Sequence, residues 1–354
     1  MRILISGICG FVGSTVGLAL REAWQDAAIF GFDNFVRPGS ELNRPALRRA
    51  GITVRHGELR SASDIDALPN ADWVIDAAAN PSVLAGVDNQ TSSRQVVEHN
   101  LGGTINLLEY CKARRAGFIL LSTSRVYSIS ALKQLKVVAS GNAFQPDPGD
   151  QRIRGFSAAG ISEGFSNEPP LSLYGCTKLA SECLALEYGE AFDFPVWINR
   201  CGVLAGAGQF GRFDQGIFTF WINSWLRQQP LKYLGFEGRG YQVRDCLHPR
   251  DLVALLKKQM SEQSATCRII NLGGGIANSM SLVQLSDWCS ERFGPREVLA
   301  DATPRPFDIP WLVLDCQRAS SEWGWRAETP VVKVLEEIAT HATNHPKWLE
   351  ISAS

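Results

Sequence analysis

The sequence predicts an α/β protein in which a Rossmann-type doubly wound parallel sheet is joined to a smaller C-terminal α/β lobe. Three observations indicate this fold class. Short apolar runs alternate with longer helix-like segments up to about residue 200, and a glycine-rich loop directly follows the first run. After about residue 202 the alternation becomes irregular, and eight of the ten tryptophans lie beyond residue 190. A chain of 354 residues also exceeds the usual size of a single core, which favours two lobes.

Buried parallel strands and their crossover helices account for the alternating pattern. A parallel strand that is covered on both faces is apolar along its whole length, as these short runs are. The segments between the runs are long enough for a crossover helix. The predicted strands are residues 3–6, 28–32, 53–56, 73–77, 118–122 and 196–199, and the predicted helices are residues 14–25, 92–115 and 173–192.

The predicted domain boundaries lie where this pattern changes. Residues 1–200 are expected to form the first domain and residues 201–354 mainly the second lobe, with a segment of about residues 242–272 returning to the first domain. Within the first domain, residues 128–170 are rich in Gly, Pro, Ser and Asp and form a long insertion. Loops of this length in compact enzymes are usually functional, as lids or binding loops.

The composition disfavours several classes of partner. The formal net charge is -1, so no overall field attracts nucleic acid or an anionic membrane surface. No apolar run approaches the roughly 20 residues that span a bilayer, and the N-terminal run is too short for a signal peptide. The nine cysteines show no C-x-x-C spacing, which favours free thiols in a reducing cytosol over a zinc site or a redox pair. We therefore expect a cytoplasmic protein with no bound metal and no membrane or nucleic-acid partner.

A glycine loop at the end of the first strand predicts a dinucleotide site. The loop has a G-x-x-G-x-x-G pattern and opens the first helix. Glycines allow a tight turn and let backbone N–H groups approach a pyrophosphate, whose negative charge the helix N-terminus favours. The expected contacts are Gly7, Gly10, Phe11, Val12 and Gly13.

A carboxylate at the end of the second strand predicts which dinucleotide is bound. Asp33 lies twenty residues after Gly13, where it can accept hydrogen bonds from the adenosine ribose. The same carboxylate would repel a 2′-phosphate. NAD is therefore the predicted cofactor, and nearby Arg37 keeps NADP as the alternative.

A Tyr-x-x-x-Lys pair is the element expected to carry the chemistry. Tyr174 and Lys178 are four residues apart, about one helical turn, so their side chains lie on one face. A phenol with a pKa of about 10 is a weak base at neutral pH, but a nearby ammonium and the positive nicotinamide favour the phenolate. Thr123 ends a strand at the carboxyl edge of the sheet, where its hydroxyl can hydrogen-bond the reacting oxygen. Tyr174 is the predicted base for a sugar hydroxyl while NAD accepts the hydride.

Residues 7–13, 122–127 and 174–178 together resemble the extended short-chain dehydrogenase/reductase family, and within it the nucleotide-sugar epimerases. The resemblance extends over nearly the whole chain and implies that Thr123, Tyr174 and Lys178 form the catalytic set. The implied cofactor contacts are Asp33, Asn34, Glu58, Leu59, Ala77, Ala78, Ala79, Asn100, Ser122, Tyr174, Lys178 and Cys201. The family favours a homodimer or homotetramer whose dimers pair the helix after the fourth strand with the helix that contains Tyr174.

The second lobe resembles one branch of these epimerases, the CDP-paratose 2-epimerases, also called CDP-tyvelose 2-epimerases. The resemblance lies in residues 209–216, 242–248, 271–274 and 278–279. It implies inversion of C2 of a CDP-linked deoxysugar, with Arg244 and Arg305 on the diphosphate and Asp308 on the nucleotide ribose. Guanidinium groups suit a diphosphate because they can bind it bidentately. The further expected substrate contacts are Thr123, Gln209, Asp214, Gln215 and Gln242.

Two related reactions are disfavoured and others stay open. A 4,6-dehydratase needs an acid pair after the strand-end threonine and a decarboxylase typically carries glutamate there, but Ser124 and Arg125 follow Thr123. Inversion at C4 of a UDP-sugar is the strongest rival, because the same three residues serve it and only the orientation of the sugar differs. The remaining alternatives are a nucleotide-sugar reductase, which releases NADH in each turnover, and a non-catalytic NAD-binding sensor.

Overall fold

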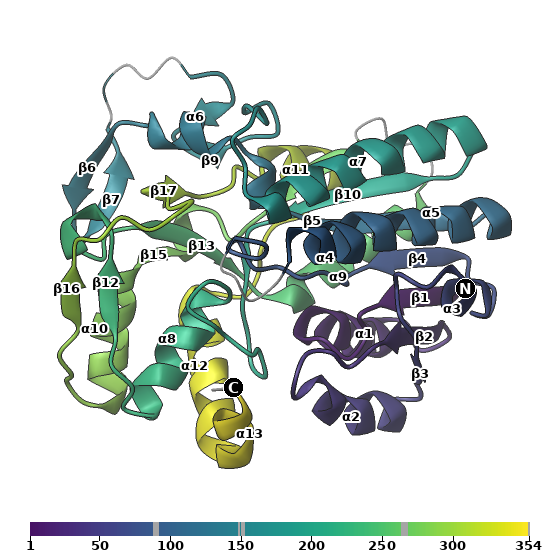
Figure 1. The fold of residues 1–354 in the computed structure, drawn as a ribbon, viewed down its shortest axis with the longest axis horizontal. Coiled ribbons are helices and arrows are strands. Elements are labelled where there is room, and N and C mark those ends of the chain that lie inside the picture. The colour runs from purple at the N-terminus through teal and green to yellow at the C-terminus, as the bar shows by residue number, and fades with distance from the viewer. Residues whose placement is uncertain (88–91, 148, 150–152, 263–267, 353–354) are drawn as a thin grey trace.

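The computed structural model describes residues 1–87, 92–147, 149, 153–262 and 268–352, and its largest unit is a seven-stranded parallel sheet (Figure 1). The strand order is β3-β2-β1-β4-β5-β10-β14, and every neighbouring pair is parallel. This arrangement confirms the predicted Rossmann-type fold. The strands are β1 (Arg2–Ser6), β2 (Ala28–Asp33), β3 (Thr53–His56), β4 (Trp73–Asp76), β5 (Gly117–Thr123), β10 (Val196–Cys201) and β14 (Ile269–Leu272).

Helices cover both faces of this sheet, which explains why its strands are apolar throughout. Ile3 and Ile5 of β1 point into the apolar cluster on one face, and Leu4 between them points into the cluster on the other. Figure 1 shows α7 beside β10, α5 beside β4, and α1 and α2 beside the strands from β1 to β3. The first face is covered by α1 (Phe11–Ala23), α2 (Arg44–Arg49), α9 (Leu252–Ser261) and α11 (Gln317–Trp323), and the other by α3 (Ala62–Asp66), α5 (Gly103–Arg114) and α7 (Leu173–Phe192).

Two of the predicted helices show how local chemistry sets their limits. The helix predicted at residues 173–192 is α7, which begins where the Ser172 side chain accepts the N–H of Gly175 at 3.0 Å. The helix predicted at residues 92–115 is divided into α4 (Ser93–Val97), a π-helical turn η2 (Glu98–Gly102) and α5. Turns of this kind often occur at functional sites, and this one contains Asn100.

The second lobe has its own sheet and its own core, in which α8 and α12 pack together. Phe218, Trp221 and Trp225 of α8 contact Leu335 and Ile338 of α12 in one apolar cluster. The sheet contains β11 (Val203–Leu204), β13 (Val243–Leu247), β15 (Ser279–Ser281) and β17 (Trp311–Leu312), and β12 (Lys232–Leu234) pairs with β16 (Leu299–Asp301). The helices are α8 (Ile217–Leu226), α10 (Leu282–Phe293), α12 (Val331–Asn344) and α13 (Pro346–Ile351).

The segment of about residues 242–272, expected to return to the first domain, contains strand β13, helix α9 and strand β14. Strand β13 pairs with β11, β15 and β17, so residues 243–247 belong to the second lobe. Helix α9 and strand β14 then pack on the large sheet. In the part of the chain that the structure describes, no helix has both the length and the apolar character needed to cross a membrane.

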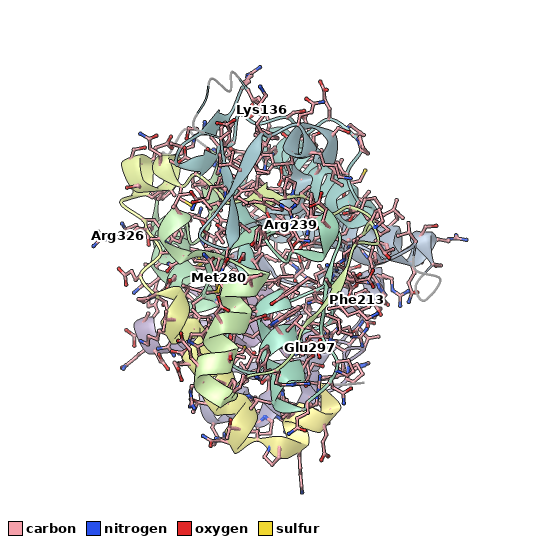
Figure 2. The ribbon with its side chains drawn as sticks, turned by 90° about the vertical axis from the view of Figure 1, so that its left-hand side faces the viewer. Lys136, Phe213, Arg239, Met280, Glu297 and Arg326 are labelled. Atoms are coloured by element: carbon pink, nitrogen blue, oxygen red, sulfur yellow. The ribbon has the colours of Figure 1, made fainter. Side chains whose placement is uncertain are left out.

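The insertion at residues 128–170 contains regular structure, although residues 148 and 150–152 lie outside the described part. It comprises α6 (Ile129–Lys133) and the antiparallel pairs β6 (Val137–Ser140) with β7 (Ala143–Pro146) and β8 (Phe156–Ser157) with β9 (Gly160–Ile161). The Phe144 N–H donates to the Tyr241 carbonyl at 2.8 Å, and Ile161 bridges to Leu314. The insertion therefore packs on the second lobe, and Figure 2 shows Lys136 of the insertion above Met280 of β15.

Candidate active site

The predicted site residues gather where the strand order of the large sheet reverses. The reversal lies between β1 and β4, and ligands of doubly wound sheets bind outside the carboxyl ends of the strands at such a point. Ser6, Asp76 and Thr123 are the last residues of β1, β4 and β5. All three are buried, so they form the floor of this region.

The glycine loop between β1 and α1 requires glycine for close packing. Gly7 has a φ of 61°, and a Cβ on it would lie 3.0 Å from the Cα of Ala78. A Cβ on Gly13 would lie 2.2 Å from the carbonyl oxygen of Gly7. No side chain caps the N-terminus of α1 in this described segment. The N–H groups of Phe11, Val12 and Gly13 are therefore free to bind an anion such as a pyrophosphate.

Asp33 at the end of β2 is hydrogen-bonded to the same loop. Its Oδ2 accepts the N–H of Cys9 at 3.0 Å and its Oδ1 accepts the N–H of Phe35 at 2.8 Å. Burial raises the pKa of Asp33, while N–H donors from Phe35, Cys9 and Gly10 act in the opposite direction. The carboxylate thus lies beside the start of α1, where the fold places an adenosine ribose.

Asn34 and Glu58, predicted near the adenosine, contact each other. Asn34 Nδ2 donates to Glu58 Oε2 at 3.1 Å. Burial raises the pKa of Glu58, but hydrogen bonds from Arg60 and Asn34 outweigh it and bring the pKa to about 2. A surface hollow of about 540 Å³ is lined by Glu58, Arg60 and Asn106 among others. Leu59 instead packs inward, and its carbonyl accepts Asn106 Nδ2 at 2.8 Å.

Two hydrogen bonds join the lobes beside the glycine loop. Arg37 Nη2 donates to the Phe210 carbonyl at 2.5 Å, and burial lowers the pKa of Arg37 to about 10, assisted by the charge of Arg212. The Ser82 hydroxyl donates to the Asp214 carboxylate. Arg37, the one feature that kept NADP open, therefore has a protein acceptor on the second lobe. Asp214, predicted to contact the substrate, lies at this junction of the lobes.

A buried polar network that sequence reasoning missed braces the ends of β1 and β4. Ser6 Oγ accepts the N–H groups of residues 77 and 78 at 3.0 Å each and donates to Asp76 Oδ1 at 2.7 Å. Thr104 Oγ1 of α5 donates to Asp76 Oδ2 at 2.9 Å. The predicted cofactor segment 77–79 is thereby held against the glycine loop. The available signal was an aspartate inside an otherwise apolar strand.

Asn100 in the π-helical turn connects the loop after β4 to α7. Its Oδ1 accepts the N–H of Asn80 at 2.8 Å, and its Nδ2 donates to the Asn80 carbonyl at 3.1 Å and to Thr177 Oγ1 at 3.2 Å. Thr177 directly precedes Lys178. Asn100 therefore positions the loop after β4 against the helix that carries Tyr174 and Lys178.

The structure brings the three predicted catalytic residues together. Thr123, Tyr174 and Lys178 are all buried, and Thr123 lies close enough to the Tyr174 phenol to act on its pKa. Burial raises the pKa of Tyr174 to about 12, while the Thr123 hydrogen bond and the charge of Arg125 act in the opposite direction. The Lys178 charge also acts on the thiol of Cys201, the β10 residue that pairs with Thr123.

A buried ion pair between β10 and α7 lies next to these catalytic residues. Arg200 Nη2 of β10 donates to Glu182 Oε2 of α7 at 2.6 Å, and Ser122 Oγ donates to Glu182 Oε1 at 2.5 Å. Tyr127 accepts from Arg200 Nη1 at 3.4 Å and donates to Asn271 Oδ1 at 2.7 Å. The Ser122 hydroxyl, predicted among the cofactor contacts, is thus engaged in this network. Glu182 was not identified from the sequence.

Two of the predicted substrate residues have structural partners within the second lobe. Gln209 Nε2 donates to the Leu204 carbonyl at 2.9 Å, and its Oε1 accepts from Thr219 Oγ1 at 2.7 Å. The N–H of Gln215 donates to the Arg212 carbonyl at 3.0 Å, which closes a tight turn. The side-chain amide of Gln209 therefore stabilises the loop that leads to Asp214.

The other predicted substrate residues form one cluster. Asp308 accepts from Gln242 Nε2 at 3.2 Å and from Arg244 Nη2 at 3.4 Å. Arg305, three residues before Asp308, donates to the Phe213 carbonyl at 2.5 Å. Gln242 Oε1 is buried and has no hydrogen-bond partner in the described structure. The orphaned acceptor suits an N–H or O–H donor of a ligand, and the two guanidinium groups suit an anionic group.

Arg125 joins this cluster from the first domain. Its backbone N–H donates to Thr123 Oγ1 at 3.2 Å, and its Nη1 donates to the Phe307 carbonyl at 3.4 Å. Burial, assisted by the charge of Arg244, lowers the pKa of Arg125 to about 9. The sequence indicated only that Arg125 stands where a dehydratase carries an acid. Its contact with the second lobe depends on tertiary structure.

Comparison with known proteins identifies similar sequences over most of the chain. The model of the NAD dependent epimerase/dehydratase family matches residues 3–273. CDP-paratose 2-epimerase of Salmonella typhi is 29% identical over 311 residues, which cover 82% of this chain and 85% of that protein. UDP-glucuronate 4-epimerase 4 of Arabidopsis thaliana is 25% identical over 364 residues, which cover 95% of this chain and 74% of that protein.

Solved structures share the fold. UDP-glucose 4-epimerase of Thermotoga maritima with UDP-glucose has a TM-score of 0.77 and 20% identity, covering 98% of this chain and 100% of that one. UDP-glucuronic acid 4-epimerase of Bacillus cereus, in complex with UDP-glucuronic acid and NAD, has a TM-score of 0.74 and 22% identity, covering 97% and 99%. The resemblance to NAD-dependent nucleotide-sugar epimerases that the motifs predicted is thus confirmed. Because the family model covers more than half of the sequence, this chain belongs to the NAD dependent epimerase/dehydratase family, and NAD is its cofactor.

Proposed function

We propose that this protein is an epimerase of a nucleoside-diphosphate sugar that oxidises one carbon transiently and then reduces it from the opposite face. The observation that carries the proposal is the contact between Thr123 and Tyr174 at the end of β5, with Lys178 one turn further along α7. NAD supplies hydride acceptance and return when it is bound. The side chains of the chain itself supply proton transfer and orientation.

Each catalytic residue has a role that its position supports. Tyr174, as the phenolate, removes the proton of the sugar hydroxyl, and Thr123 hydrogen-bonds the developing carbonyl oxygen. Lys178 holds the nicotinamide ribose and favours the phenolate through its charge. Between the two steps the keto-sugar rotates so that its opposite face is presented to the hydride. The distant nucleotide and diphosphate keep it in the site meanwhile.

The substrate we propose is a CDP-linked deoxysugar that is inverted at C2. Support comes from the likeness to CDP-paratose 2-epimerase, which covers 82% of this chain. It also comes from the cluster of Gln242, Arg244 and Asp308, with Arg305 nearby, which offers charged and polar groups for a nucleoside diphosphate. Inversion at C4 of a UDP-sugar is the second candidate, because UDP-glucuronate 4-epimerases match up to 95% of the chain.

We also propose a cytosolic homodimer. The described cysteines are all free thiols, which suits a reducing compartment. Val97 of α4 and Phe192 of α7 are 41% and 44% exposed, on the two helices through which dimers of the family are expected to pair. A second copy covering these residues would bury that apolar surface.

The test is incubation of the purified protein with CDP-, UDP-, GDP- and dTDP-sugars in deuterated water, with NMR detection at C2 and C4. Inversion at C2 of a CDP-sugar, without added NAD and without solvent deuterium at the inverted carbon, is the expected result, because the hydride returns to the carbon it left. Inversion at C4 would replace the substrate assignment. Net release of NADH would indicate a reductase, and no turnover of any sugar would indicate a sensor.

Two variants of the same helix separate catalysis from folding. Tyr174→Phe is expected to keep NAD and to lose nearly all turnover, because the proton acceptor is removed. Tyr188→Phe is the matched control, since Tyr188 lies on α7 and its hydroxyl donates to the exposed Glu109 at 2.7 Å. Equal activity of the two variants would refute the assignment of Tyr174 as the base.

A further inference from the structure

The charge balance of the substrate cluster is incomplete without a third cation. The diphosphate of a nucleotide sugar carries two negative charges. Arg244 already faces the Asp308 carboxylate at 3.4 Å, so these two groups largely neutralise each other. Arg305 then leaves one positive charge for two phosphate charges. The cation that completes the balance must come from another residue near the same segment.

Arg125 occupies the required place. Its Nη1 donates to the Phe307 carbonyl, while Arg244 Nη2 donates to the Ile309 carbonyl at 2.9 Å. Two residues of chain span at most about 7 Å, so these two acceptors are close together. Arg305 begins the same segment. Three guanidinium groups therefore surround residues 305–309, two from the second lobe and one from the strand end that carries Thr123.

The Arg125 side chain also has donors to spare. Among the described residues, Phe307 is the only hydrogen-bond acceptor of its guanidinium, and that bond is long at 3.4 Å. An arginine has five N–H donors in a planar fork that matches phosphate oxygens. Burial and the charges of Arg244 and Arg305 lower the pKa of Arg125 to about 9, although the Asp308 carboxylate acts in the opposite direction.

We propose that Arg125 binds the phosphate of the substrate that is attached to the sugar, and so fixes the first carbons of the sugar ring beside Thr123 and Tyr174. This rests on the proposed function, since it deepens the assignment of a nucleotide-sugar substrate. The position of Arg125 explains why we assign it to the phosphate on the sugar and not to the phosphate on the nucleoside. Its backbone contacts Thr123 and its side chain reaches the arginine cluster, so it lies between the catalytic groups and the nucleotide end.

The other charged groups near this cluster have different partners. Asp245 is buried, and its carboxylate accepts the N–H of Leu314 at 3.4 Å and packs against Gly202 and Gly273. Lys178 lies near Cys201 on the cofactor side. Neither group therefore supplies the missing positive charge or cancels that of Arg125.

The experiment compares nucleoside diphosphates with monophosphates on the NAD-loaded protein by titration calorimetry. CDP and CMP are titrated first, and the uridine, guanosine and thymidine pairs follow, so that the base preferred by the wild type is found in the same experiment. Arg125→Gln is expected to weaken binding of the preferred diphosphate by about ten- to a hundredfold, the usual range for losing a charged hydrogen bond. Binding of the monophosphate is expected to change less than about twofold, because its single phosphate is the one attached to the nucleoside, which Arg125 does not contact in this proposal.

Two further variants complete the design. Arg94→Gln, at an exposed position of α4, removes the same charge and is expected to leave both affinities unchanged. Arg125→Lys keeps the charge but loses the planar fork, so a smaller, diphosphate-specific loss is expected. Arg125→Lys also tests the proposal if Arg125→Gln does not fold.

Several outcomes would overturn the proposal. Equal effects on diphosphate and monophosphate would indicate a structural role for Arg125. If Arg125→Gln bound the diphosphate as the wild type does but lost turnover at low pH, Arg125 would act on the Tyr174 phenol instead. If the wild type bound diphosphates no more tightly than monophosphates, the protein would have no binding site for the second phosphate. A preference for another base would contradict only the proposed CDP-sugar, and the role of Arg125 would still be decided with that base.

Discussion

Glu182→Gln is expected to destabilise the protein strongly, because it leaves the charge of Arg200 buried without a partner. The side chains of the pair are 2% and 4% exposed. Glu182 accepts from Arg200 Nε at 3.1 Å and Nη2 at 2.6 Å and from Ser122 at 2.5 Å. Burial alone would lower the pKa of Arg200, but Glu182 raises it above its ordinary value. Breaking a buried pair by removing one partner costs about 3–5 kcal/mol.

The measurement compares the single variant with a double variant by denaturant unfolding. Glu182→Gln is expected to lower the free energy of unfolding by about 3–5 kcal/mol. The double variant Glu182→Gln with Arg200→Met removes both charges and is expected to recover much of that loss, because replacing a whole buried pair is often neutral. Tyr127 keeps Asn271 as its acceptor in the double variant. The reasoning fails if the single variant loses less than about 1 kcal/mol, or if the double variant is less stable than the single one.

Three further predictions concern the cofactor loop, the base and a buried carboxyl group. Gly13→Ala is expected to abolish NAD retention, because its Cβ would lie 2.2 Å from the Gly7 carbonyl oxygen, whereas Gly102→Ala, whose Cβ meets nothing closer than 3.9 Å, should retain NAD. Titration of the tyrosine absorbance should assign a pKa of about 12 to Tyr174 without NAD, and the positive nicotinamide should lower it. Burial raises the pKa of Asp245 to about 6, so the folded protein binds a proton that the unfolded chain has lost between about pH 4 and 6. Wild-type stability should fall by about 3 kcal/mol relative to Asp245→Asn over that interval, and parallel pH profiles of the two proteins would contradict this.

The fold was predictable because local sequence and global arrangement agree in the first domain. Strands buried on both faces are apolar along their length, and the termini of six of the seven strands were predicted to within two residues, whereas β14 was not predicted as a strand. The helix at residues 92–115 was harder, because nothing in its periodicity marks the π-helical turn at Asn100. That turn is stabilised by contacts with Asn80 and Thr177, which are distant in sequence. The pairing of residues 243–247 was not predictable for a similar reason, since their partner strands are distant in the sequence.

The residues of the candidate site also fall into two groups, those that a local motif indicates and those that only tertiary contacts reveal. Motif residues such as Gly7, Asp33 and Tyr174 could be proposed from the sequence because their spacing and chemistry belong to one segment each. The residues that brace them, such as Glu182, lie on the inward faces of helices and strands. A buried carboxylate there gives no pattern in the sequence until its arginine is known to be opposite. Arg125 was visible in the sequence, but its relation to Arg244 required both lobes to be in place.

The distribution of charge connects stability with binding. The whole chain carries a formal charge of -1, yet burial lowers the pKa of Arg125 to about 9 and that of Arg37 to about 10. A lowered arginine pKa means that the folded protein holds a cation less favourably than water does. A diphosphate that binds only the folded state would offset this cost and raise the unfolding temperature with its concentration. On the proposed function, the positive charge that Arg125 offers to a phosphate therefore also makes the ligand-free protein less stable than its core alone would permit.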